Sequence, residues 1–242
     1  MSIQVIVNGA RGKMGSLACH TLKNHPDFTV VAELTKSDNL SEVIAAQKAQ
    51  VVVDLTRADC VYENTMSIIE QGAHPVIGTS GLSDEQINNL TLICDSKRLG
   101  GIIVPNFSIS AVLMMLFAEQ AARYLCDVEI IEAHHAEKFD APSGTALKTA
   151  EMIAKTRQAA KNDPCRESIH GVRGGNHHDV KIHSLRLPGI IARQDIVFGS
   201  QGETLTISHN TIDRMCFMPG LILCCQKVMN LDSLYYGLEY LL

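Results

Sequence analysis

The sequence has no excess of basic residues and no run of Lys and Arg. Its 242 residues include 21 Lys and Arg against 26 Asp and Glu, which gives a formal net charge of −5. A surface that binds nucleic acid normally carries a concentrated patch of positive charge. We therefore expect no nucleic-acid partner, and any anion that binds this protein must be held by local groups.

Long apolar segments are also absent. The longest runs from Ala111 to Ala118, far below the roughly 20 residues that a membrane-spanning helix needs. The N-terminal residues MSIQVIVNG have neither the basic region nor the cleavage site of a signal peptide. The hydrophobic content of 46% is typical of globular proteins. The sequence therefore predicts a soluble, cytoplasmic protein without a membrane partner.

Paired cysteines are missing too. The eight cysteines include no CxxC pair, and most have apolar neighbours. A chain of this length can build a hydrophobic core without disulfides. We interpret the cysteines as small buried thiols in a reducing compartment.

The first part of the chain alternates short β-branched runs with helical patterns. Five strands are predicted, at Ile3–Val7, Thr29–Glu33, Val51–Leu55, Pro75–Gly78 and Ile102–Val104. Helices are expected to begin near Gly12, Ser41, Ala58 and Ser83. Continuous apolar strands separated by amphipathic helices indicate a parallel sheet with helices on both faces. This half is predicted to be a doubly wound, Rossmann-type α/β domain.

The pattern changes after Pro105. A helix is expected at 110–124, a strand at 128–133 and a second helix from Ser143. Three more strands, at 180–187, 190–198 and 204–209, are expected to alternate as antiparallel strands joined by turns at Pro188-Gly189 and Gln201-Gly202. Residues 168–179 are expected to form a loop, and a helix at 220–229 closes the chain. This half is predicted to be an α+β domain with a mostly antiparallel sheet.

We place the expected domain boundaries from this change of pattern. Residues 1–107 and 215–242 would form a dinucleotide-binding domain. Residues 108–214 would form a domain for substrate binding and oligomerisation. Neither part contains an internal repeat that would suggest a different organisation.

Three glycines at a spacing of three, Gly9, Gly12 and Gly15, follow the first predicted strand and precede a helix. Glycine at such positions permits a tight turn, close approach of the backbone to a diphosphate, and close packing of the helix on the strand. The helix N-terminus then presents unpaired N–H groups to the phosphates. This arrangement predicts a dinucleotide site at the start of the chain.

The end of the second predicted strand bears on which dinucleotide binds. Glu33 is the nearby candidate for the acid that bonds the ribose hydroxyls of NAD. Lys13 and Lys36 would instead favour the 2′-phosphate of NADP, although each also fits an ordinary surface lysine. NADPH and NADH both stay open. Two further turns, at 78–81 and 105–108, follow predicted parallel strands and would approach the nicotinamide half.

The segment from His134 to Thr145 carries the most chemistry. His134 and His135 end a predicted strand, Lys138 follows, and a Pro-Ser-Gly-Thr turn opens a helix. A histidine can donate a proton near neutral pH, the lysine offers positive charge, and the helix start can hold a carboxylate. The alternatives are a structural histidine pair, a simple helix cap, or a metal site. The metal site is disfavoured because no Cys, Asp or Glu stands at ligand spacing as in HExxH.

The sequence EAHHAEKFDAPSGTA at 132–146 closely resembles the signature of the dihydrodipicolinate reductase family. The likeness extends over essentially the whole chain, including the turn at 9–15, VIGTSG at 76–81, Asn106–Ser108 and Arg214-Met215. The resemblance implies reduction of the cyclic imine dihydrodipicolinate, or 4-hydroxy-tetrahydrodipicolinate, to tetrahydrodipicolinate with NADPH or NADH. This reaction belongs to diaminopimelate and lysine biosynthesis. The resemblance also implies a small dicarboxylate substrate and a homotetramer.

The resemblance further implies roles for individual residues. His134 would be the proton donor, Lys138 a second donor that also holds substrate, and His135 a substrate contact. Gly144 and Thr145 would hold a substrate carboxylate. The expected cofactor-binding residues, with Lys36 added from its charge, are Gly9, Ala10, Arg11, Gly12, Lys13, Met14, Lys36, Gly78, Thr79, Ser80, Val104, Pro105, Asn106 and Phe107. No metal is implied.

The sequence departs from longer members of the family in two places. It has a short connection between the second and third strands, and Thr35-Lys36 where some relatives have an acidic-then-basic pair. Two other functional classes stay open. A dinucleotide-sensing module would bind the cofactor without turnover, and a metal-dependent hydrolase would use His134 and His135 with His177 or His178.

Overall fold

The computed structural model describes residues 2–158 and 165–242. Their backbone divides into two compact units. Unit 1 consists of residues up to 109 together with 214–242, and unit 2 lies between residues 110 and 213. None of the helices in the described residues combines the length and hydropathy needed to cross a bilayer.

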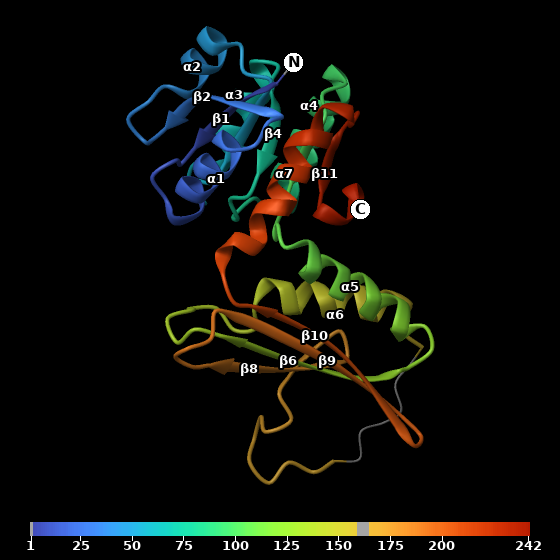
Figure 1. Ribbon diagram of the computed structural model, residues 1–242. Coiled ribbons are helices and arrows are strands. Elements are labelled where there is room, and N and C mark those ends of the chain that lie inside the picture. Colours follow the sequence, from blue (N-terminus) through green and yellow to red (C-terminus); the bar gives the residue numbers. More distant parts are fainter. Residues whose placement is uncertain (1, 159–164) are drawn as a thin grey trace. The chain divides into compact units, whose positions relative to one another are not determined.

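Unit 1 is built on a six-stranded parallel sheet with the strand order β11-β5-β4-β3-β1-β2 (Figure 1). The strands are β1 (Ile3–Asn8), β2 (Phe28–Leu34), β3 (Val51–Asp54), β4 (His74–Ile77), β5 (Gly101–Ile103) and β11 (Leu234–Tyr236). The sequence analysis predicted the first five. It missed β11, whose three residues pair with β5 at the edge of the sheet and are too short to show a period.

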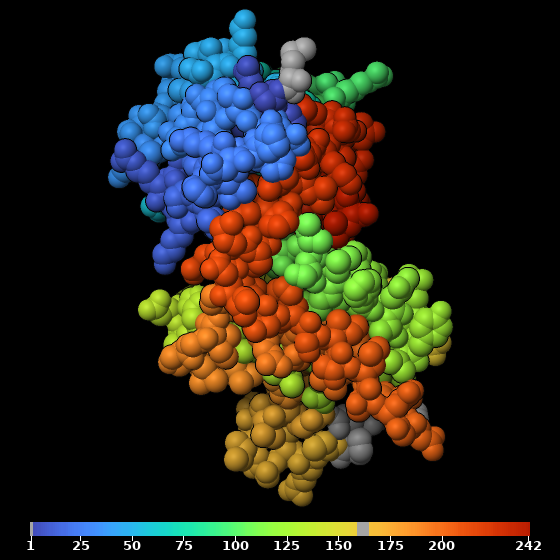
Figure 2. All heavy atoms as spheres, in the orientation of Figure 1, coloured from blue at the N-terminus to red at the C-terminus, as the bar shows by residue number. Residues whose placement is uncertain are grey.

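Helices cover both faces of this sheet. They are α1 (Lys13–Lys23), α2 (Leu40–Gln47), α3 (Val61–Glu70), α4 (Asp84–Lys97) and α7 (Met218–Lys227), with short 3₁₀ turns at Arg214–Phe217, Val228–Asn230 and Leu238–Leu241. One face packs against α2, α3 and α4 through buried apolar residues such as Ile44, Ile68 and Leu90. On the other face α1 contacts α7. Figure 2 shows the red C-terminal segment lying against the blue N-terminal elements, so both chain ends build one unit. The predicted doubly wound α/β architecture is confirmed.

The start of α4 agrees with its sequence signal. Ser83 is the N-cap, and its hydroxyl accepts a hydrogen bond from the backbone N–H of Gln86 at 3.2 Å. The Gln86 side chain in turn accepts from the backbone N–H of Ser83 at 3.0 Å. This capping box satisfies two donors that the first turn of a helix leaves unpaired.

Unit 2 has a five-stranded sheet with the order β10-β9-β6-β8-β7 and two helices on one face (Figure 1). The strands are β6 (Asp127–His134), β7 (Gly175–His177), β8 (Val180–Arg186), β9 (Ala192–Ser200) and β10 (Glu203–Thr211), and the helices are α5 (Ile109–Ala122) and α6 (Gly144–Thr156). Three of the four strand pairs are antiparallel and the β6–β8 pair is parallel. The expected mostly antiparallel sheet is confirmed.

Two details of unit 2 correct the sequence analysis. Strands β8 and β9 are not hydrogen-bonded neighbours, because β6 lies between them and pairs with Ile182 on one side and Ile196 on the other through Ile130. Because β6 has a neighbouring strand at each edge, its apolar side chains pack against side chains of both β8 and β9. A β8–β9 hairpin would not give β6 these two neighbours. In addition, the expected loop at 168–179 contains β7, which pairs with β8 at the sheet edge. Its Gly-Asn-His sequence carries no strand propensity.

Candidate active site

The Gly9–Gly15 turn closes tightly around the end of β1. Gly9 has a φ angle of +86°, and a Cβ atom at this position would lie 2.4 Å from the carbonyl oxygen of Leu55. A Cβ atom on Gly15 would lie 2.0 Å from the carbonyl oxygen of Gly9. Only glycine fits both positions. Gly12 is the N-cap of α1 and brings no side chain to the helix N–H groups, so these donors can hold an anion.

This turn lies at the switch point of the sheet. Strand β1 lies between β2 and β3, so the chain runs from β1 to β2 on one side and from β3 to β4 on the other. Open α/β sheets bind ligands at this position. Two of the other expected cofactor segments, at Gly78 and Phe107, follow β4 and β5. A Cβ atom on Gly78 would lie 2.6 Å from Cε2 of Phe107. The two turns therefore pack against each other.

Asp54, a fully buried carboxylate that the sequence analysis did not identify, connects these turns. Its Oδ1 accepts hydrogen bonds from the hydroxyls of Thr79 at 2.6 Å and Thr56 at 2.7 Å, and from the Thr56 backbone N–H at 3.2 Å. Its Oδ2 accepts from the side-chain amides of Asn8 and Asn64, each at 2.9 Å. The carboxylate thus joins the ends of β1, β3 and β4. An acidic residue directly after three valines was the available sequence signal.

The turn after β2 contains another acid that the sequence analysis missed. Asp38 accepts hydrogen bonds from the backbone N–H of Thr35 at 2.7 Å and from its hydroxyl at 2.9 Å. These bonds, the backbone one first, lower the pKa of Asp38, and the positive charge of Arg11 contributes. The ribose end of the expected cofactor site therefore holds both an anionic and a cationic side chain.

Glu33, the acid expected at the ribose, is engaged elsewhere. Its Oε1 lies 2.5 Å from the Nζ of Lys23 on α1. Lys13 and Lys36 are both exposed. Both acids near the end of β2 therefore already have partners, whereas the two lysines are accessible to a phosphate.

In unit 2, His134 is held by a buried carboxylate. Its Nδ1 lies 2.6 Å from Oε2 of Glu132, which is fully buried two residues earlier on β6. Arg186, opposite His134 on β8, donates to Oε2 at 3.1 Å and to Oε1 at 2.9 Å. Glu132 is thus paired with the guanidinium of Arg186 and with the imidazole of His134. The sequence analysis named neither Glu132 nor Arg186 as functional.

Glu132 stays ionised in this environment. Burial raises its pKa, but hydrogen bonds from His134, Arg186 and Ser184, together with the charge of Arg186, outweigh burial and lower the pKa to about 2. The carboxylate therefore accepts the Nδ1 proton of His134. This bond fixes the ring orientation and leaves Nε2 as the nitrogen that can exchange a proton with a ligand.

The segment after His134 is tied to the same network. Lys138 Nζ donates to both oxygens of Asp140, at 2.7 and 2.9 Å. This hydrogen bond is the main cause of the lowered pKa of Asp140. Arg186 also donates to the backbone carbonyl of Asp140 at 2.6 Å. One guanidinium therefore holds both the carboxylate behind His134 and the loop that carries Lys138.

The N-terminus of α6 lies at the end of this loop. Ser143 is the N-cap, and its Oγ accepts a hydrogen bond from the backbone N–H of Ala146 at 3.2 Å. Gly144 is exposed, and a Cβ atom there would meet nothing within 4 Å. The first turn contains no acidic residue. The backbone N–H groups near Gly144 and Thr145 can therefore receive a carboxylate.

The histidines of the hydrolase alternative do not form one site. His134 pairs with Arg186 at the end of β8, whereas His177 pairs with Val180 at its start. Six residues of strand separate these positions by about 20 Å. Within the described residues, His134 and His135 belong to no group of three possible metal ligands.

Unit 1 has a parallel sheet with an open helix N-terminus at its switch point, and unit 2 carries a histidine held by a carboxylate. This combination is typical of dinucleotide-dependent oxidoreductases. Family models for dihydrodipicolinate reductase match residues 3–107 with the N-terminal part and residues 110–242 with the C-terminal part. The chain therefore belongs to the dihydrodipicolinate reductase family, an NAD(P)H-dependent group of oxidoreductases of lysine biosynthesis. The resemblance noted from the sequence is confirmed.

Individual relatives are similar over their full length. The chain is 63% identical over 243 residues to the 4-hydroxy-tetrahydrodipicolinate reductase of Legionella pneumophila strain Paris. It is 49% identical over 242 residues to the 4-hydroxy-tetrahydrodipicolinate reductase of Coxiella burnetii strain Dugway 5J108-111. Each comparison covers 100% of both chains. A solved structure of dipicolinate-bound dihydrodipicolinate reductase from Paenisporosarcina sp. TG-14 is 42% identical, with a TM-score of 0.92 and 100% coverage of both chains. An amine dehydrogenase from Mycobacterium smegmatis, 10% identical with a TM-score of 0.69 over 97% of this chain and 95% of that chain, shares the fold.

Proposed function

We propose that this chain reduces dihydrodipicolinate, or its hydrated form, to tetrahydrodipicolinate, with His134 as the proton donor. The observation that carries the proposal is the 2.6 Å contact between His134 Nδ1 and the buried Glu132 carboxylate. A charged carboxylate behind an imidazole stabilises the protonated ring and orients it for transfer. This is the property that an acid in such a reduction needs.

The proton step follows from the substrate chemistry. A bound NADH or NADPH supplies the hydride to the far end of the conjugated imine. The resulting enamine must take a proton on carbon. His134 breaks its Nε2–H bond as the new C–H bond forms, and solvent then restores the proton. Glu132 remains ionised throughout because its pKa is about 2.

The substrate carboxylates require positive charge and N–H donors. Lys138 provides the charge, and its bidentate bond to Asp140 keeps the ammonium group in one place. The N–H groups of Gly144 and Thr145 at the start of α6 receive one carboxylate. His135, half-buried beside His134, supplies a further contact. These assignments define a site for a small dicarboxylate.

The cofactor diphosphate fits the turn at the start of α1. The positions of Gly9 and Gly15 exclude any Cβ atom, and the exposed Gly12 leaves the backbone open to a phosphate. Asp54 holds Thr79 and Thr56 at the neighbouring strand ends. The remaining residues assigned to this site are Ala10, Arg11, Lys13, Met14, Lys36, Gly78, Ser80, Val104, Pro105, Asn106 and Phe107.

The assembly is proposed to be a homotetramer. The sheet face of unit 2 opposite α5 and α6 carries Ile131 and Leu185, which are 38% and 39% exposed. Apolar side chains on an open sheet face favour burial between subunits. Light scattering with size-exclusion chromatography would show four chains, and a monomer would contradict the proposal. Cys19, Cys94, Cys224 and Cys225 are buried thiols that form no disulfide, which supports a cytoplasmic, reducing location.

An absorbance assay with freshly prepared cyclic imine tests the activity. The chain is supplied with NADH and NADPH in separate reactions, and oxidation of either cofactor that depends on the imine is the expected result. Cofactor binding without turnover would support the dinucleotide-sensing alternative. The ratio of kcat/KM for NADPH to kcat/KM for NADH would then show which cofactor is preferred. The two basic side chains of Arg11 and Lys36 and the acidic side chain of Asp38 do not decide this preference by themselves.

A further inference from the structure

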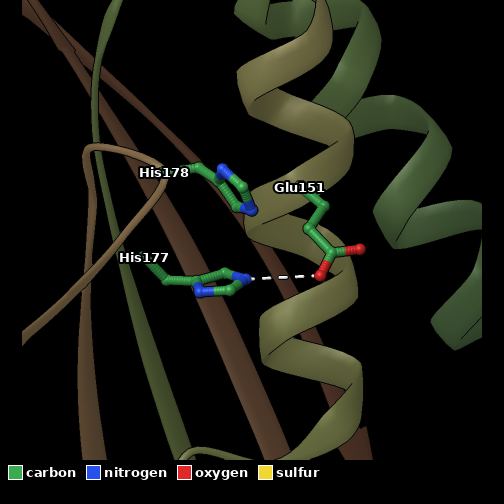
Figure 3. A group of neighbouring side chains, drawn as sticks. All are labelled: Glu151, His177 and His178. Atoms are coloured by element: carbon green, nitrogen blue, oxygen red, sulfur yellow. Dashed lines mark hydrogen bonds and ion pairs between the residues drawn. The ribbon is translucent and has the colours of Figure 1, made fainter.

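Glu151, His177 and His178 gather at the β7 edge of unit 2, and Figure 3 shows their side chains pointing toward one another. Glu151 projects from α6, His177 is the last residue of β7, and His178 begins the turn into β8. One ligand atom from each side chain lies within 4.8 Å of the others. Three donors from a helix and an edge strand therefore converge on one place.

We propose that Glu151, His177 and His178 bind a divalent transition-metal ion of the Zn²⁺ class. Two imidazole nitrogens and a carboxylate form a donor set found at zinc sites with an open fourth position. His177 Nε2 and Glu151 Oε1 are 3.3 Å apart. Neighbouring ligand atoms of a tetrahedral site with bonds of about 2.05 Å are also about 3.3 Å apart. The His178 nitrogen lies within 4.8 Å of both atoms, and a small side-chain rotation brings it to the same spacing.

The turn that carries His178 has a backbone conformation that non-glycine residues adopt uncommonly. His178 and Asp179 have φ angles of +50° and +61°, the conformation of a two-residue hairpin turn in which Asn and Gly are preferred. Arg157, at the end of α6, donates to the backbone carbonyl of Asp179 at 3.0 Å. The turn is thus held against the helix that supplies Glu151. A metal ligand at position 178 offsets the conformational cost of histidine there.

The site is separate from the proposed chemistry of His134. His177 and His134 pair with opposite ends of β8, about 20 Å apart along the strand. An ion at this position contacts none of the reacting groups. Its effect is to fasten the edge strand β7 to α6, so metal binding stabilises the fold without being required for turnover.

Titration of the untagged, chelator-treated chain with Zn²⁺ tests the proposal. Calorimetry should show one equivalent bound, and Zn²⁺ at about 100 times Kd should raise the midpoint of thermal unfolding by roughly 5–10 °C. Co²⁺ should give the visible spectrum of nitrogen and oxygen ligation, without the charge-transfer bands of thiolate ligands. A thiolate spectrum would assign the binding to cysteines and overturn the proposal.

Variants identify the ligands. His177→Gln and Glu151→Gln should each weaken Zn²⁺ binding at least about tenfold, whereas His170→Gln, at a fully exposed histidine of the same loop, should leave it unchanged. His178→Asn should lose the metal-dependent stabilisation and raise the stability of the metal-free chain, because Asn suits the turn. Reductase activity should be unaffected in all four variants. Equal Zn²⁺ binding by the chain and by the His177→Gln and His178→Asn variants would overturn the proposal.

Discussion

The Nδ1 atom of His134 lies 2.6 Å from the Oε2 atom of Glu132, a carboxylate without solvent exposure. Glu132 is on the inner face of β6, where Arg186 of the neighbouring strand binds both of its oxygens. A buried anion is costly unless it is paired and hydrogen-bonded. The pairing explains why this carboxylate can sit behind the proposed acid and remain charged.

Replacing Glu132 with Gln tests its role as a positioning residue. We expect kcat to fall by about 10–10²-fold. The KM for the imine should change little, because Glu132 orients His134 and does not itself hold the substrate. Steady-state kcat and KM for the chain and the variant provide the measurement. A purely structural role would lower the amount of folded protein and leave the kcat of the folded fraction unchanged, and Glu132→Asp should restore part of kcat.

Replacing the proposed acid separates proton donation from binding. His134→Gln should lower kcat by about 10²–10⁴-fold and leave cofactor affinity nearly unchanged. Lys138→Ala should raise the KM for the imine and lower kcat, because it removes the charge that holds a carboxylate. Steady-state kinetics and cofactor titration distinguish the two. Loss of cofactor binding in the first variant, or unchanged KM and kcat in the second, would remove that residue from its proposed role.

Acid should destabilise the protein through Glu132. Its folded-state pKa of about 2 lies below the ordinary value of 4.5. A lowered pKa contributes stability above pH 4.5 that is lost as the pH falls towards 2, on the order of 3 kcal/mol in total. Urea unfolding between pH 7 and pH 3 measures the loss. Glu132→Gln should be less stable at pH 7, because Arg186 loses its partner, and the difference from the original chain should shrink as the pH falls. A constant difference would contradict the prediction.

Asp54→Asn should disturb the proposed cofactor site from inside unit 1. The new amide group brings a donor to a position where Thr79, Thr56, Asn8 and Asn64 already donate. We expect a loss of about 1–3 kcal/mol in unfolding free energy and weaker cofactor binding. Chemical denaturation and fluorescence titration with NADPH and NADH measure these effects. Reduced stability with unchanged cofactor affinity would limit Asp54 to a structural role.

Two glycine variants compare packing with ligand access. A Cβ atom on Gly15 would lie 2.0 Å from the Gly9 carbonyl oxygen, whereas a Cβ atom on Gly12 would lie 3.3 Å from it. Gly15→Ala should therefore destabilise the fold strongly. Gly12→Ala should fold and weaken cofactor binding, because the methyl group meets the diphosphate. Thermal unfolding and cofactor titration provide the measurements, and normal cofactor affinity in Gly12→Ala would place the diphosphate elsewhere.

The helices of unit 1 and all its strands except β11 could be predicted because their patterns are local. Residues 51–53 are three consecutive valines that only a doubly covered strand buries, and Ser83 with Gln86 forms a cap within one turn. Strand β7 could not be found in this way. Its Gly-Asn-His sequence becomes a strand because β8 offers a free edge, and a pairing partner distant in sequence leaves no local pattern.

The amino-acid sequence alone determined the class of each unit, the glycine turn, the His134–Lys138 segment and the family, because these depend on short-range patterns and residue types. Tertiary structure decided which side chains meet. Arg186 reaches Glu132 from 54 positions away, and Thr79 reaches Asp54 from 25 positions away. The physical reason is that a buried charge requires partners from whichever strands the sheet places beside it, and strand order is set by the burial of whole apolar faces.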